Sequence, residues 1–287
     1  YWTQPCHFVQ TKDIVPVVYA NPIGTDTAAP FTGSYNGVEH SIAGLEVAGN
    51  TKVSGMFGAF AGTTVKNLTV SALTLTGATT GSVGLIASIS TNATIDNITL
   101  NNVNVSGITG AANVAGLIGA TNDSTVAVNN VSVTFLTDAG ISGNSAAGLI
   151  GTAGSNTSIT NANVTTQGTG AITGVTYASG LVGMFNGTGI DNANVSLSAA
   201  LSTTGANSFV GGIAGNAVTA NISNSDVAFA QAVSTAGLTS NLGGIAGKAD
   251  ATDISNSNVT FAQAVSTTGS TSNLGGIAGN VSGSSSL

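Results

Sequence analysis

Side chains that could do acid–base or nucleophilic chemistry are sparse in this chain of 287 residues. It has eleven carboxylates, two histidines, four lysines, one cysteine and no arginine. Asp250 and Asp253 are the nearest candidates for the carboxylate pair that a glycoside hydrolase needs. They flank a turn whose counterparts elsewhere in the chain have no acids, so we predict no catalytic pair there.

Other enzyme classes lack their usual residues as well. Polysaccharide lyases often need an arginine to stabilise an enolate, and this chain has none. His7 and His40 both lie near the amino terminus, where we expect them to serve packing, and nothing distinguishes one of the many serines as a nucleophile. We predict that the chain is not an enzyme, with a carbohydrate-active enzyme as the alternative.

Metal, cofactor and nucleic-acid sites also lack their sequence signals. Calcium-binding β-rolls need a Gly-Gly-x-Gly-x-Asp array, and the chain has Gly-Gly-Ile-Ala-Gly without the acid. No Gly-Lys-Ser/Thr phosphate loop occurs, so we predict no metal and no cofactor. Four lysines and a pI near 4.2 exclude a basic nucleic-acid footprint. Cys6, the only cysteine, can form no internal disulfide; we expect a free thiol, with an intermolecular bridge as the alternative.

A Gly-rich pentapeptide recurs down the chain and limits the fold. Its second residue is always glycine, and the eight copies are Gly55, Gly84, Gly116, Gly148, Gly180, Gly212, Gly244 and Gly276. The first interval is slightly shorter than the six that follow, and those six are equal. Fixed periods of roughly 20–50 residues are typical of solenoids, propellers and arrays. We therefore interpret the chain as a stack of eight copies of one unit.

An Ile-x-Asn segment repeats in step with the pentapeptide. Its asparagines follow the pentapeptide glycines at a nearly constant interval and are Asn67, Asn97, Asn130, Asn161, Asn192, Asn224 and Asn256. If each unit is one turn of a solenoid, these side chains stack in a column and hydrogen-bond to one another. Asparagine also tolerates the left-handed backbone of a tight bend. We predict a structural asparagine ladder at a corner.

Alternation after the asparagine predicts strands. Val195, Leu197, Ala199 and Leu201 share one parity, with serines between them. Segments of period two, broken by turns, favour strands that pair with their equivalents in the turns above and below. We predict an all-β, right-handed parallel β-helix of about eight coils with a period of about 32 residues. At roughly 4.8 Å per coil, it would be a rod on the order of 40 Å long.

The pentapeptide predicts an outer apolar stripe. Its third residue is always large, so we expect it to point inward and its neighbours, the second-position glycine and the fourth residue, to point outward. The fourth residues would then form an association stripe against another chain: Phe57, Ile86, Ile118, Ile150, Val182, Ala214, Ala246 and Ala278. The alternative is that the corner turns this residue inside.

Residues 1–48 differ in composition from the repeats. They hold all four prolines and an aromatic group of Tyr1, Trp2, Phe8, Tyr19, Phe31 and Tyr35. A solenoid has open ends that need caps, so we predict an amino-terminal cap and entry segment over 1–48 and repeats over 49–287. The sequence has no apolar run long enough to cross a bilayer, so we predict no membrane span.

The repeats resemble a known family. Gly-Leu-Ile-Gly at 116–119 and 148–151 and Gly-Leu-Val-Gly at 180–183, each followed by Ile-x-Asn or Val-x-Asn, resemble the GLUG-motif repeats of bacterial surface proteins. Residues 30–37, Pro-Phe-Thr-Gly-Ser-Tyr-Asn-Gly, are similar to the segment that commonly precedes such repeats. Ala214, Ala246 and Ala278 depart from the motif, which has a larger hydrophobe there.

The resemblance implies location and role. It implies a filamentous-haemagglutinin-like β-helix, exported and displayed on bacterial cells as an adhesive or structural element of a surface fibre. Expected partners are a host or neighbouring cell surface or other copies of the chain, with a glycan as a further candidate. The alternative is a subunit of an extracellular filament that assembles end to end or side by side.

Overall fold

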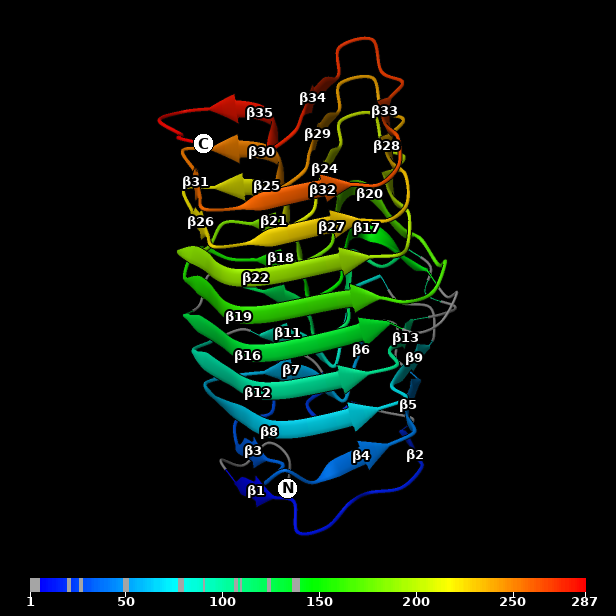
Figure 1. Cartoon of the computed structure of the whole chain (residues 1–287). Helices are drawn as coiled ribbons and strands as arrows, with labels where there is room; N and C mark the ends of the chain where they lie inside the picture. Colours follow the sequence, from blue (N-terminus) through cyan, green and yellow to red (C-terminus); the bar gives the residue numbers. More distant parts are fainter. Residues whose placement is uncertain are drawn as a thin grey trace.

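The chain forms a β-solenoid. A computed structural model describes residues 6–19, 22–25, 28–48, 52–76, 80–89, 91–105, 108, 110–122, 125–135 and 140–287. Regular structure in these ranges is entirely β, and they contain no helix of the length and apolarity that crossing a membrane requires. Strands from successive repeats pair in parallel and stack into a rod with the two termini at opposite ends (Figure 1).

Three long sheets make the walls of the rod. The front sheet in Figure 1 contains β1 (His7–Val9), β3 (Ser34–Asn36), β4 (Ser41–Ala43), β8 (Thr63–Ser71), β12 (Ala93–Asn101), β16 (Val126–Phe135), β19 (Thr157–Thr166), β22 (Gly189–Leu197), β26 (Asn221–Ser223), β27 (Asp226–Phe229), β31 (Asp253–Ser255) and β32 (Asn258–Phe261). The back sheet contains β7 (Phe57–Phe60), β11 (Ile86–Ile89), β15 (Ile118–Thr121), β18 (Ile150–Ala153), β21 (Val182–Phe185), β25 (Ala214–Val218), β30 (Ala246–Asp250) and β35 (Ala278–Ser282).

The side sheet joins the front sheet to the back sheet. It contains β6 (Val53–Ser54), β10 (Ser82–Val83), β14 (Asn113–Ala115), β17 (Ile141–Ala147), β20 (Ile172–Ser179), β23 (Leu201–Thr203), β24 (Phe209–Gly211), β28 (Val233–Thr235), β29 (Asn241–Gly243), β33 (Val265–Thr267) and β34 (Asn273–Gly275). A small fourth sheet near the amino terminus holds β2 (Val17–Tyr19), β5 (Leu45–Ala48), β9 (Thr74–Thr76) and β13 (Asn104–Val105).

The predicted fold class is confirmed. In Figure 1 the chain runs left to right along the front sheet, returns right to left along the back sheet, and climbs from the amino to the carboxyl end, which is a right-handed turn. The back sheet has eight strands, one for each pentapeptide. From the first of these eight strands to the last, the chain makes about seven complete turns. The eight predicted coils therefore correspond to the eight strands of the back sheet, each of which we call a rung.

The interior is one continuous apolar column. Side chains of the parity that the sequence assigns to the inside, such as Val195, Leu197 and Leu201, are at most 3% exposed. The core extends without a break from Ile23 to Ile254. Burial of aliphatic stacks, one layer per turn, is therefore the main source of stability for the rod.

The predicted outer apolar stripe is wrong. Phe57, Ile86, Ile118, Ile150, Val182, Ala214 and Ala246 are fully buried, and Ala278 in the last rung is partly buried and packs against the core. The third-position residues of the same pentapeptides, such as Leu149, are fully buried as well. Two consecutive side chains therefore enter the core, as the alternative interpretation of the corner required.

The backbone explains why alternation fails at the pentapeptide. The N–H groups of Leu149 and Ile150 both donate to the carbonyl of Leu181, at 3.0 Å each. Two donors converging on one acceptor turn the chain, and a new strand, β18, starts at Ile150 with its own inside and outside. The second-position glycine also faces inward, because a Cβ atom on Gly148 would lie 2.5 Å from Cγ1 of Val164 in the front sheet. Glycine is needed there for close approach.

The shape of a turn changes along the rod although the period is constant. Compared with the turn before it, the turn that contains β23 and β24 has three more residues between its two side-sheet positions (Leu201 to Val210 against Ile172 to Ala178). The same turn has two residues fewer between its front-sheet and side-sheet strands, and one residue fewer between its back-sheet and front-sheet strands. From β23 onward, the longer segments form loops that stack on one another and project beside the carboxyl-terminal rungs (Figure 1).

The amino-terminal segment forms the first rungs of the same solenoid. β1, β3 and β8 pair in sequence within the front sheet, and Phe31 bridges to Phe60 of the back sheet. Phe31 lies 5.2 Å from Phe57 and 5.9 Å from Phe8 between ring centroids. The predicted boundary at 48/49 meets residues 49–51, which lie outside the described residues, as do Tyr1 and Trp2.

Replacing the second-position glycine tests the corner. We expect Gly148→Ala to lower the free energy of unfolding by about 1–3 kcal/mol, because the new methyl group would overlap the backbone carbonyl oxygen of Gly180 and the side chain of Val164. Gly276→Ala is the matched control, because a Cβ atom at Gly276 meets nothing within 4 Å. Urea unfolding followed by circular dichroism measures both. Equal stability of the two variants would contradict the packing role assigned to Gly148.

Candidate functional site: the outer face of the front sheet

The seven predicted ladder asparagines all lie at one corner of the front sheet. Each has a left-handed backbone, with φ between 49° at Asn256 and 55° at Asn161. This conformation is unfavourable for most L-residues, whereas asparagine adopts it readily. This conformation interrupts the in-out alternation of the strand. The asparagine and the residue before it therefore both point away from the core, on the two surfaces that meet at the corner.

Side-chain hydrogen bonds join five of these seven asparagines in two runs, which include neither Asn224 nor Asn256. Within each run the Nδ2 group of one asparagine donates to Oδ1 of the asparagine one turn below. The first run is Asn97 to Asn67 at 2.9 Å and Asn67 to Asn36 at 3.1 Å; the second is Asn192 to Asn161 at 2.7 Å and Asn161 to Asn130 at 3.0 Å. The ladder therefore starts at Asn36, which the sequence interpretation did not include.

Two aspartates act as acceptors in the ladder, which sequence reasoning missed. Asn130 donates to Oδ1 of Asp96 at 2.9 Å, and Asn224 donates to Oδ1 of Asp191 at 2.8 Å. Both aspartates are the middle residue of an Ile-x-Asn segment, so their position in that motif was the available signal. Hydrogen bonds from Ser223 Oγ and Asn224 Nδ2 hold the pKa of Asp191 below its ordinary value.

The two acids that the sequence singled out have separate partners. Asp250 accepts a 2.9 Å hydrogen bond from Lys248 Nζ, and this contact holds the pKa of its carboxyl below the ordinary value. Asp253 accepts hydrogen bonds from the backbone N–H of Ser286 at 3.0 Å and from its hydroxyl at 2.7 Å. Asp253 thus ties β31 to the segment that follows β35, whereas the contact of Asp250 with Lys248 stays within β30.

The amino-terminal polar residues also form local pairs. His7 Nδ1 lies 2.7 Å from Ser34 Oγ, and His40 Nδ1 lies 3.5 Å from Asp13 Oδ1. Asp13 accepts a hydrogen bond from the Ser41 N–H, and this bond is the largest cause of its lowered pKa. Cys6 is a free thiol. In the described ranges no three His, Cys, Asp or Glu side chains are grouped as a metal site would require.

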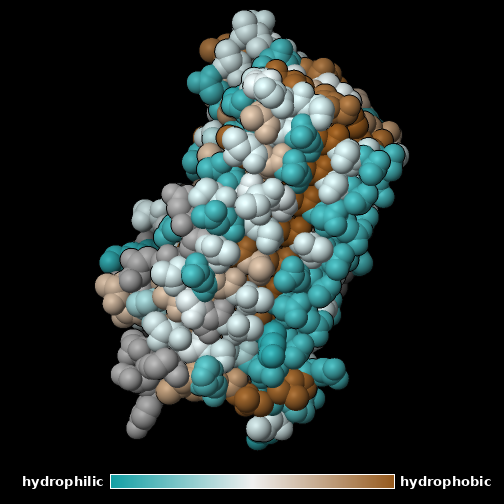
Figure 2. All heavy atoms as spheres, turned by 90° about the vertical axis from the view of Figure 1, so that its left-hand side faces the viewer, coloured by the Kyte–Doolittle hydropathy of each residue, from teal (hydrophilic) through white to brown (hydrophobic). Residues whose placement is uncertain are grey.

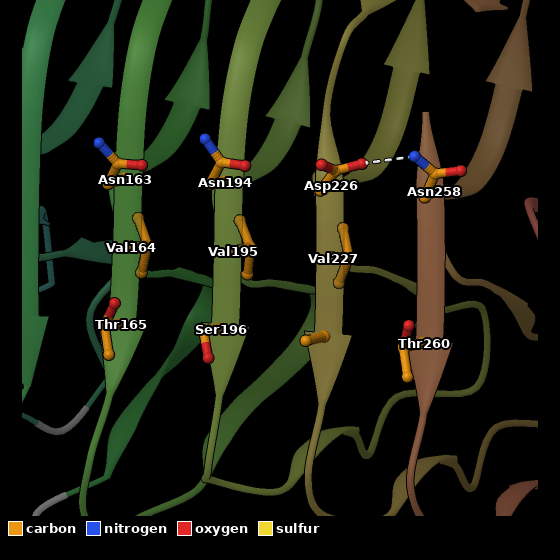
Figure 3. A pocket seen from close by; sticks show the side chains of 11 residues that line it. Asn163, Val164, Thr165, Asn194, Val195, Ser196, Asp226, Val227, Asn258 and Thr260 are labelled. Atoms are coloured by element: carbon orange, nitrogen blue, oxygen red, sulfur yellow. Dashed lines mark hydrogen bonds between the residues drawn. The ribbon is translucent and has the colours of Figure 1, made fainter. Parts of the chain in front are cut away.

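A shallow groove of about 410 Å³ lies on the outer face of the front sheet, between β19 and β32. One side of the groove is a row of registered amide and carboxylate side chains, and the other is a row of mostly hydroxyl side chains (Figure 3). The first row is Asn163, Asn194, Asp226 and Asn258; the second is Thr165, Ser196, Ala228 and Thr260. The groove runs along the rod axis, and the backbone of Val164, Val195 and Val227 lies between the rows.

The edge of the rod where the front sheet begins is polar as well, with a hydrophobic band beside it (Figure 2). Hydrophilic residues form a band along the length of the rod on the edge where the front sheet begins (Figure 2). In the groove itself the side chains of Asn163 and Asn194 are exposed. The one hydrogen bond between the residues drawn in Figure 3 joins Asn258 Nδ2 to Asp226 Oδ1 at 2.9 Å. The groove thus offers neutral hydrogen-bonding groups to solvent on successive turns.

Substitution of Asn161 separates the two roles of a ladder residue. We expect Asn161→Gly to cost about 0.5–1.5 kcal/mol, because it removes side-chain hydrogen bonds but keeps the left-handed backbone accessible. Asn161→Ala should cost about 1–2 kcal/mol more, because alanine is strained at a φ of 55°. Chemical unfolding of both variants measures the difference. Equal stabilities would show that the corner does not require the left-handed conformation.

Acid should weaken the ladder at Asp191. Its pKa is lower in the folded chain than its ordinary value of 3.8, so the contribution to stability is present above that value and is lost as pH falls through the folded pKa. We expect Asp191→Asn, which keeps an acceptor oxygen, to reduce the pH dependence of the melting temperature below about pH 4. An unchanged acid slope in this variant would contradict the assigned contribution.

Comparison of the chain with protein families, with curated proteins and with solved structures found no match. The solenoid fold therefore rests on the sheet topology, and the likeness to GLUG repeats rests on the motif residues alone.

Proposed function

We propose that this chain is a non-catalytic, structural and adhesive element of a bacterial surface fibre, displayed outside the cell as a rigid β-solenoid rod of the GLUG-repeat type. The observation that supports the proposal best is the repetition of the same polar rows on the outside of successive turns. A surface of this kind presents hydrogen-bonding side chains many times along one axis. Repeated weak contacts to a repetitive partner surface then add up to strong attachment.

Two features of the rod suit exposure outside a cell. Backbone hydrogen bonds and the asparagine ladder tie each turn to the next, which stiffens the rod along its axis. The chain has four lysines and no arginine, so proteases that cut after basic residues have few sites. The partner surface would be that of a host cell or of a neighbouring cell.

Retention of cells on the isolated chain tests the adhesive role. Beads coated with the purified chain should retain host or bacterial cells about tenfold better than beads coated with an unrelated acidic protein at the same density, because many weak contacts act together. Flow-chamber counting measures retention. Equal retention on the two kinds of bead across a panel of cell types would overturn the adhesive part of the proposal.

End-to-end assembly is a second candidate because the carboxyl-terminal rung has partly exposed core side chains. Leu274 is 53% exposed, and Val259, Phe261, Val265 and Ile277 are only partly buried. Apolar side chains and strand edges at the end of a solenoid favour stacking of another rung. In this candidate the occupant is the amino-terminal rung of a second copy.

Negative-stain electron microscopy distinguishes the two candidates. Separate rods on the order of 40 Å long support the single-rod proposal. Uniform fibres many times longer than one chain support end-to-end assembly. Leu274→Asp, which places a charge on the end rung, should shorten such fibres without unfolding the chain. Fibres of unchanged length in this variant would contradict assembly through this end.

A further inference from the structure

We propose that the groove between β19 and β32 binds a linear, neutral polysaccharide side-on, with successive sugar units lying along the rod axis. The inference rests on the proposed adhesive function and names the class of its ligand. It starts from the groove that outward side chains of the front sheet form over its last four rungs (Figure 3).

The groove is built by a change in side-chain length along a single row. In the earlier rungs this row is short: Ser41, Thr69, Thr99 and Ser132 are in register one above another. From β19 onward the same row holds longer side chains, Asn163, Asn194, Asp226 and Asn258. The longer side chains raise one side of the groove only in the last four rungs, so the groove is a local feature and not a general property of the sheet.

The exposed groups match the hydrogen-bonding capacity of sugars. Each asparagine amide carries two N–H donors and one acceptor oxygen, and each serine or threonine hydroxyl both donates and accepts. Sugar hydroxyls also donate and accept, so they can pair with either side of the groove. Asn163 and Asn194 are exposed on successive turns opposite Thr165 and Ser196.

Charge and apolarity in the groove favour a neutral glycan over other partners. Asp226 is the only charged residue that lines the groove, and its carboxylate disfavours polyanions such as acidic polysaccharides and nucleic acids. A protein partner would need large apolar side chains to pack against at the centre of the interface, and the side chains of Val164, Val195 and Val227 are turned into the core and at most 3% exposed. Calcium would need more carboxylate and carbonyl ligands than this single acid and the spaced amides provide.

The shape of the groove favours a polymer. The groove is open along its length and repeats its groups once per rung, at roughly 4.8 Å, so it can receive an internal stretch of a long chain. No aromatic side chain lines it, so each sugar unit gains only hydrogen bonds and the affinity per unit is low. Affinity should therefore rise with the length of the oligosaccharide until the four rungs are filled.

Binding to a glycan array, followed by calorimetry on the best hits, tests the inference. We expect neutral linear glycans to bind, with affinity that increases from disaccharide to longer oligomers, and polygalacturonate not to bind. The double variant Asn163→Ala/Asn194→Ala should bind about tenfold more weakly, the loss expected for two uncharged hydrogen bonds. Asn221→Ala is the matched control, because Asn221 is an exposed asparagine of β26 outside the groove.

Melting curves show whether the variants are folded, which we expect because the replaced side chains are exposed. Absence of binding to every neutral glycan overturns the inference, as does binding to acidic glycans alone or an equal loss in Asn221→Ala. If coated beads retain cells equally well with and without the double substitution, the glycan groove is wrong and the adhesive function stands. If beads coated with the unaltered chain retain no cells, the adhesive function itself fails.

Discussion

Register between successive turns is the constraint on which the rest of this structure depends. In a parallel solenoid the N–H groups of one turn donate to carbonyls of the turn above or the turn below, so each residue stacks on its counterpart one period away. A slip of one residue would exchange the inside and outside faces of a strand. The chain keeps its period constant even where part of each turn moves from the corners to the side sheet. Length can therefore shift from the corners of a turn to its side sheet while the total per turn stays the same.

Because the turns stack in register, each residue contacts its counterparts in the turns above and below, and these counterparts form a column along the rod. A substitution therefore affects the contacts of a whole column. The glycine of the pentapeptide lets the corner approach Val164 and its equivalents, and an asparagine at the opposite corner supplies both the bend and a hydrogen bond to the next turn. Asp96 and Asp191 fit into this column because a carboxylate oxygen accepts from the asparagine above as an amide oxygen does. Either an amide oxygen or a carboxylate oxygen can therefore accept the hydrogen bond in this column, but the following turn must supply the side-chain N–H group that donates it.

The sequence predicted the solenoid and the inward parity of its strands, because period and alternation are properties of the chain itself; the right-handed turn follows instead from the general handedness of connections between parallel strands. The sequence also placed the seven asparagines where the structure has the left-handed corner. It failed at the pentapeptide, where strict alternation assigned Ile150 to the outside. The convergence of two N–H groups on Leu181 resets the alternation, and nothing in the sequence marks that convergence. The groove was missed because each of its sides is assembled from residues one full period apart, all of them ordinary within their own strands.

The front sheet changes on both faces at the same rung, which connects the groove to the interior. The inward row beside the asparagine corner falls from Leu68, Ile98 and Val131 to Ala162 and Ala193 as the strands pass from β16 to β19. In the same step the outward row grows from Ser132 to Asn163. Interior packing sets how the turns stack, whereas outward side chains are free of that requirement. The carboxyl-terminal turns therefore combine smaller side chains in this one inward row with longer side chains in the outward row. We propose that recognition takes place on those turns and that the amino-terminal turns, whose outer side chains in this row are shorter, serve as their support.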